Sequence, residues 1–200
     1  KPIYALEGSV FIGGAVIQWL RDEMQILSKT SDAEEMAQAV ESSDGVVIVP
    51  AFTGLGAPYW DMDARGIITG LTRGSNRNHL VRAALESIAF QVNDLLDSIF
   101  TDLDFMISSL QVDGGATANN FLMQFQSDIL RMKIDRSENI ESTAMGAGML
   151  AGLGAGFWSD PSKLKAVRSS DKIFTPTIDE NTRTTLLCAW KKAVQKAQTI

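Results

Sequence analysis

The chain has 200 residues, enough for one ordinary domain that buries most of the surface of its unfolded state. Its 24 acidic residues outnumber its 18 basic ones, and the net charge of −6 argues against a nucleic-acid partner. The single cysteine, Cys188, cannot form an internal disulfide, and we expect it to be a packing residue of the last helix. The sequence shows neither an apolar run of membrane-spanning length nor an export signal, so we expect no membrane association and a cytoplasmic location.

Period-2 and period-3.6 patterns of apolar residues alternate along the chain, which predicts a layered α/β fold. In chain order the patterns predict a strand within residues 3–11, helices over 13–25 and 33–41, strands over 46–50 and 66–71, a helix over 78–100, a strand over 107–112, a helix over 118–130, a strand over 132–136, and helices over 141–153 and 181–198. Residues 159–177 contain two prolines, and we expect them to be irregular and peripheral.

The helix predicted over residues 13–25 opens with Gly14 and, four positions later, Gln18. This spacing places both residues on one face, where they can approach a ligand that lies across the start of the helix. A plainer interpretation makes Gly14 a close-packing glycine and Gln18 a solvated side chain.

The longest predicted helix, over residues 78–100, has an apolar stripe along one side, and Asn76 or Asn78 can cap its start. His79, the single histidine, lies in its first turn without a second metal-ligating residue at suitable spacing. We therefore interpret His79 as a surface or capping residue and predict no metal-binding residues. No lysine-containing P-loop motif is present either.

Residues 110–125 read as a buried strand, a glycine turn and a helix start in immediate succession. Gly114 and Gly115 occupy the turn, and two adjacent residues without a β-carbon let a ligand approach the main chain closely. The free N–H groups at the start of the next helix favour an anion at this position. The alternative is an ordinary tight turn capped by Asp113 or Asn119.

The helix predicted over residues 141–153 contains several glycines and alanines. Each interior glycine costs a helix about 1 kcal/mol relative to alanine, so several together need a packing reason. We expect this helix to approach a neighbouring helix closely.

Four blocks of the sequence closely resemble glycerol kinases, in the same order: residues 4–23, 50–61, 66–91 and 110–125. The resemblance covers about residues 4–158, is thinner beyond, and is to the carboxy-terminal half of these sugar and polyol kinases. It implies an actin-like ATPase (ribonuclease H-like) fold with a central mixed sheet flanked by helices. Residues 1–158 are then the nucleotide-binding core, and residues 159–200 add an irregular segment and a terminal helix to the same domain.

The resemblance also implies a nucleotide site. In these kinases the positions of Gly14, Gln18, Gly115 and Asn119 contact ATP or ADP, and Mg²⁺ arrives with the nucleotide. Glycerol and the catalytic aspartate belong to the amino-terminal half, so the resemblance implies no catalytic residue here, no turnover by these residues alone, and a homo-oligomer in the full-length enzyme. Two alternatives stay open: the same half of a xylulose or gluconate kinase, or a non-catalytic actin-like nucleotide-binding module.

Overall fold

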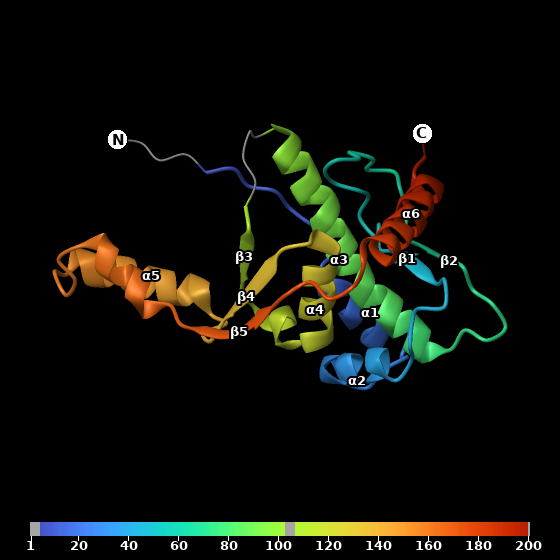
Figure 1. The fold of residues 1–200 in the computed structure, drawn as a ribbon, viewed down its shortest axis with the longest axis horizontal. Coiled ribbons are helices and arrows are strands. Elements are labelled where there is room, and N and C mark those ends of the chain that lie inside the picture. Colours follow the sequence, from blue (N-terminus) through green and yellow to red (C-terminus); the bar gives the residue numbers. More distant parts are fainter. Residues whose placement is uncertain (1–4, 103–106, 200) are drawn as a thin grey trace.

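The computed structural model describes residues 5–102 and 107–199. Figure 1 shows the chain as a helical body from which one helix projects. The elements, in order, are α1 (Ala15–Asp22), η1 (Thr30–Asp32), α2 (Ala33–Gln38), β1 (Val47–Val49), β2 (Ile67–Thr69), α3 (Arg77–Asp102), β3 (Ser109–Val112), η2 (Gly115–Ala118), α4 (Asn120–Leu130), β4 (Lys133–Ser137), α5 (Ser142–Gly154), η3 (Pro161–Val167), β5 (Ser170–Phe174) and α6 (Glu180–Ala197), where η denotes a 3₁₀ helix.

Within the described residues, the strands form two sheets. β1 and β2 pair antiparallel with Val47 opposite Thr69. In the second sheet, β4 lies between β3, with which it is parallel, and β5, with which it is antiparallel. The second sheet is therefore mixed, as the predicted fold class requires, and the buried Ile134 of β4 faces Phe174 of β5 across the pair.

Two expectations about strands are wrong. Residues 5–11, within the range predicted for a first strand, have no regular secondary structure, and Leu6 in this segment is exposed. Residues 159–177, predicted to be irregular, contain η3 and β5. The short pattern of β5 escaped notice because its residues before Phe174 are exposed and carry no alternating apolar signal.

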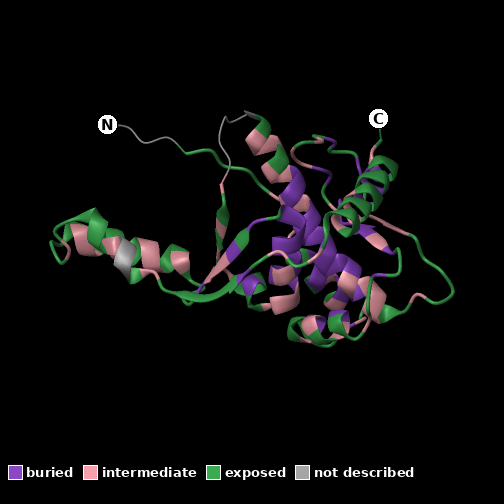
Figure 2. Cartoon of the chain, viewed as in Figure 1, coloured by how far each residue is buried: buried purple, intermediate pink, exposed green. Residues whose placement is uncertain are grey.

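The long helix α3 is the centre of the molecule and contacts α1, α2, α4 and β1. Residues 83–90 are buried on every side, whereas the sequence pattern indicated a single apolar stripe (Figure 2). At its start, the Asn76 side chain accepts from the N–H of Asn78 at 2.9 Å, and Nδ1 of His79 accepts from the N–H of Asn76 at 3.1 Å. The expected capping roles of Asn76 and His79 are confirmed.

The terminal helix α6 packs on the body through Trp190, Ala193 and Val194, which are buried. The Trp190 ring stacks on Phe90 with centroids 5.3 Å apart, and its indole N–H donates to Asp94 at 2.6 Å. Cys188 lies on the other side of α6 and is exposed, so its predicted packing role is wrong.

The projecting helix is α5, which has no buried residue (Figures 1 and 2). A β-carbon placed on Gly146, Gly148 or Gly154 would meet no atom within 4 Å, so the expected close approach to a neighbouring helix is wrong for this structure. At Gly152 a β-carbon would collide with the Trp158 ring, which folds back onto the same helix. No helix in the described part of the chain is long and apolar enough to cross a membrane.

Candidate nucleotide site

A cavity of about 630 Å³ opens where the start of α1, the η1–α2 segment, α3 and the η2–α4 segment converge. Its size is that of a typical small-molecule site. The cavity lies beyond the carboxyl end of β3, which is where ligands bind in sheets with parallel strands. Its lining is Gly14, Ile17, Gln18, Thr30, Ser31, Ala33, Glu34, Leu85, Ile88, Gly115, Ala116, Ala118, Asn119 and Leu122. The four predicted site residues, Gly14, Gln18, Gly115 and Asn119, are thus brought together from two distant segments.

On the α1 side, Gly14 is the residue immediately before the helix. A β-carbon placed on Gly14 would lie 4.0 Å from the Ala116 methyl group, so the two segments approach each other closely at the edge of the cavity. Gln18 lies one turn further on and is exposed, and its side-chain amide takes part in none of the described hydrogen bonds, whereas its main-chain N–H donates to the Gly14 carbonyl at 3.3 Å. Its amide is available to a ligand.

On the opposite side, the glycine turn is built differently from the sequence expectation. Gly114 has φ +87°, a conformation that favours glycine, and its carbonyl accepts from both the N–H and the hydroxyl of Thr117. A 3₁₀ turn, η2, then precedes α4, where the sequence predicted the α-helix to begin at once. None of the described hydrogen bonds uses the N–H of Gly115 or Ala116, and a β-carbon on Gly115 would meet open space.

Asn119 caps α4: its Oδ1 accepts from the N–H of Leu122 at 2.9 Å. Because that contact requires an oxygen, the other end of the side chain is the Nδ2 amide, a donor that is free among the described hydrogen bonds. Asn119 is therefore both the cap and a lining residue, two roles that the sequence presented as alternatives. The expected capping role of Asp113 finds no support, since its carboxylate takes part in none of the described hydrogen bonds.

Among the described residues that line the cavity, Glu34 is the single charged one. Its carboxylate is held at the wall, accepting from the N–H and Nδ2 of Asn120, each at 3.0 Å. With no lysine or arginine in this lining, the cavity suits an uncharged group that has polar edges and flat apolar faces better than it suits a polyphosphate. Within residues 5–102 and 107–199 no cluster of three or more His, Cys, Asp or Glu side chains forms a candidate metal site.

Sequence reasoning missed the lining from η1, α2 and α3. Thr30, Ser31 and Glu34 carry only the spacing of a helix start, which predicts α2 but no ligand. Leu85 and Ile88 belong to the pattern of α3 and read as core. They line the cavity because it extends to the central helix α3, and a local sequence pattern cannot predict this packing.

The arrangement is that of an α/β domain in which a glycine turn with free N–H groups borders a largely apolar cavity. The model of the FGGY family of carbohydrate kinases, C-terminal domain, matches residues 1–155. The chain belongs to this family. A glycerol kinase of Clostridium perfringens is 55% identical over 198 residues, which are 99% of this chain and 40% of that protein. The chain therefore spans about 40% of the length of the curated relatives it matches.

Solved kinase structures support the same family assignment. The crystal structure of Plasmodium falciparum glycerol kinase with ADP matches with a TM-score of 0.84 and 40% identity, covering 92% of this chain and 37% of that one. The ligand-bound xylulose kinase of Lactobacillus acidophilus matches with a TM-score of 0.76 over the same shares, but its 24% identity shows the fold alone. The predicted fold class, an actin-like sugar kinase domain, is confirmed.

Proposed function

We propose that this chain is the ATP-binding, carboxy-terminal part of a glycerol kinase, which transfers the γ-phosphoryl group of ATP to glycerol and yields glycerol 3-phosphate and ADP. The observation that carries the proposal is the meeting of Gly14, Gln18, Gly115 and Asn119 at one cavity. Support comes from a 55% identical glycerol kinase and from the likeness to a glycerol kinase solved with ADP.

The cavity fits the adenosine part of a nucleotide. Leu85, Ile88 and Leu122 offer apolar surface to a purine ring, and the Nδ2 amide of Asn119 can donate to a purine nitrogen. The free amide N–H groups at the start of η2, on Gly115 and Ala116, suit an α-phosphate oxygen. We assign Gly14 and Gln18 to the facing wall.

The phosphates beyond the first extend out of this cavity, because the described lining contains no cationic side chain to neutralise them. Mg²⁺ comes with the nucleotide and offsets that charge. During transfer the glycerol hydroxyl oxygen bonds to the γ-phosphorus while the bond to the β–γ bridging oxygen breaks. The hydroxyl proton passes to a carboxylate that we place, with the glycerol site, outside these 200 residues. The chain alone is then a half-site without turnover.

Two accompanying expectations follow from the same proposal. We propose a cytoplasmic location, where ATP is available, and a homo-oligomeric full-length kinase whose interface we do not assign to this domain.

The test is a substrate panel. The polypeptide that carries these residues together with its amino-terminal half is assayed for ADP release with glycerol, xylulose and gluconate. Glycerol should give the highest kcat/KM, because the identity to glycerol kinases exceeds that to the xylulose and gluconate kinases. Best activity on a sugar or sugar acid would contradict the glycerol assignment, and ADP binding without turnover on any of the three would favour a non-catalytic module.

A further inference from the structure

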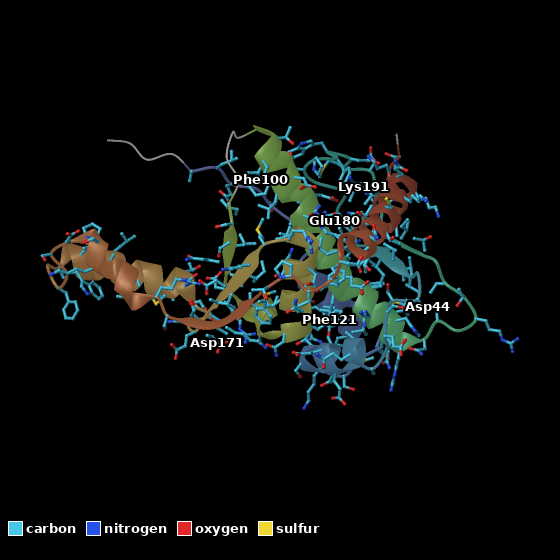
Figure 3. The ribbon with its side chains drawn as sticks, viewed as in Figure 1. Asp44, Phe100, Phe121, Asp171, Glu180 and Lys191 are labelled. Carbon is cyan, nitrogen blue, oxygen red and sulfur yellow. The ribbon has the colours of Figure 1, made fainter. Side chains whose placement is uncertain are left out.

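Two charged side chains of the three-stranded sheet, Arg136 and Asp171, lie behind the glycine turn and outside the cavity lining. Arg136 of β4 donates from Nη1 to the carbonyl of Thr117 at 2.9 Å, to the carbonyl of Ala118 at 3.4 Å, and to Oδ1 of Asn120 at 3.2 Å. Its other side pairs with Asp171 of β5, with Nη2 2.6 Å from the carboxylate. Figure 3 labels Asp171. One guanidinium thus connects η2 and α4 to the three-stranded sheet.

Glu34 holds the same residue, Asn120, from the opposite direction. Its two carboxylate oxygens accept separately from the main-chain N–H and the side-chain amide of Asn120. Asn120 therefore donates to Glu34 of α2 and accepts from Arg136 of β4. The first residue of α4 is fixed between two charges of opposite sign.

We propose that Glu34 and Arg136 are positioning residues of the nucleotide site: together they set where the Gly115 amide and the Asn119 side chain stand. The inference rests on the proposed function. Arg136 is absent from the cavity lining, so it acts through the turn rather than on the ligand. The turn needs such support, because the last carbonyls of a short 3₁₀ helix have no partners of their own.

The guanidinium suits this position for a geometric reason. Its side chain is 12% exposed, which strengthens its charge-assisted hydrogen bonds, and its planar fork reaches the carbonyls on one side and Asp171 on the other. A lysine ammonium keeps the charge but cannot span both sets of acceptors. Loss of the fork should let η2 move while the sheet, held by its backbone ladder, stays in place.

The chain offers a matched control. Arg168 pairs with Asp135 at 2.8 Å and also donates to the Asp135 carbonyl, joining the same strand β4 to the segment before β5, without a described contact to η2. Arg168→Gln therefore removes a comparable ion pair from the same sheet. This variant tests whether the loss of an ion-pairing arginine elsewhere in the sheet also weakens ADP binding.

The experiment titrates ADP into the ¹⁵N-labelled chain and its Arg136→Gln, Arg136→Lys, Glu34→Gln and Arg168→Gln variants. Dissociation constants come from amide shifts, hydrogen exchange of the 115–120 amides reports on the turn, and thermal unfolding shows how much of each variant is folded. Arg136→Gln should weaken ADP binding about tenfold, the loss of about one charge-assisted hydrogen bond, and should speed exchange in the turn. Arg136→Lys and Glu34→Gln should fall between this variant and the unsubstituted chain, and Arg168→Gln should bind normally.

Equal ADP affinity in all five proteins would overturn the positioning role, as would an equal loss in Arg168→Gln. Absence of saturable ADP binding by the unsubstituted chain would instead overturn the proposed function on which the inference rests. If Arg136→Gln does not fold, Arg136→Lys and Glu34→Gln decide: weakened binding at normal thermal stability supports the inference, and unchanged binding contradicts it.

Discussion

Gly114 and Gly115 are neighbours in the turn, but glycine suits the two positions for different reasons. Gly114 has the positive φ that only glycine adopts readily, and its carbonyl closes η2. Gly115 has room for a side chain, and that room is the cavity itself. Substitution of Gly114 should therefore damage the turn, whereas substitution of Gly115 should damage only the ligand's space.

Gly115→Val gives the sharper test of the two. We expect nearly unchanged thermal stability, because a β-carbon there meets nothing within 4 Å, and loss of nucleotide binding, because the branched side chain fills the approach to the main chain. Calorimetric titration with ADP beside a thermal melt measures both. Unchanged ADP affinity would remove Gly115 from the site.

At Asn119, capping can be tested separately from ligand recognition, because Oδ1 accepts the capping hydrogen bond while the Nδ2 amide is free to donate to a ligand. Asn119→Asp keeps an oxygen cap but loses the Nδ2 donor, so it should unfold normally and bind ADP more weakly. Asn119→Ala loses both and should also cost about 1 kcal/mol of stability. Urea unfolding and ADP titration of the pair provide the measurement, and normal binding by Asn119→Asp would show that Asn119 is a cap alone.

Asp94 predicts a pH dependence of stability. Burial raises the pKa of its carboxyl, against the lowering effect of the hydrogen bonds from Trp190 and Tyr59; Asp97 raises this pKa and Lys191 lowers it. The folded state therefore holds a proton that the unfolded state releases above about pH 4. The stabilising contribution of protonated Asp94 is present below that pH and is lost as the pH rises towards the raised pKa.

Asp94→Asn isolates this contribution, because an amide oxygen can still accept from Tyr59 and Trp190. Chemical unfolding of both proteins across the pH range should show the unsubstituted chain losing stability relative to the variant as the pH rises above about 4. A difference that does not change with pH, or that changes in the opposite direction, would contradict the raised pKa.

At the scale of elements, the helices could be predicted well, since each of α1 to α6 overlaps a helix range expected from the sequence. The sequence does not show which strand would pair with the first strand expected within residues 3–11. In the structure, residues 5–11 form no strand. Strand β5 and the turn η2 could not be predicted from local patterns, because β5 depends on its pairing with β4 and η2 is closed by the hydrogen bonds of Thr117 to the Gly114 carbonyl. The four site residues were predicted through the resemblance, whereas the lining positions of Glu34 and Ile88 are known only from the packing of the helices.

The exposed apolar surface of helix α5 leads to a separate prediction about self-association. It runs from Ser142 to Gly154 without a charged residue or a buried one, and Leu150 is 70% exposed. Such a surface promotes self-association. Leu150→Lys should reduce association at high concentration, measured by sedimentation velocity, and should change unfolding stability by no more than about 0.5 kcal/mol, as for other surface sites. A large loss of stability would show that Leu150 is packed in solution.

At the scale of the whole molecule, the proposed site is one half of a nucleotide site. We propose that the cavity holds adenosine through uncharged groups, and the described lining supplies no cation for the phosphates. Closure around the phosphates must then come from outside these residues, as it does where two lobes meet around a substrate. The isolated chain should fold yet bind ADP more weakly than micromolar.

The most direct test of this central claim is a titration of the ¹⁵N-labelled chain with ADP, followed by amide shifts. We expect saturable binding with a dissociation constant weaker than micromolar, and shifts centred on the residues of the cavity, Gly14, Gln18, Gly115 and Asn119 among them. Micromolar or tighter binding would contradict the half-site, and the absence of saturation, or shifts centred away from these residues, would contradict the site itself.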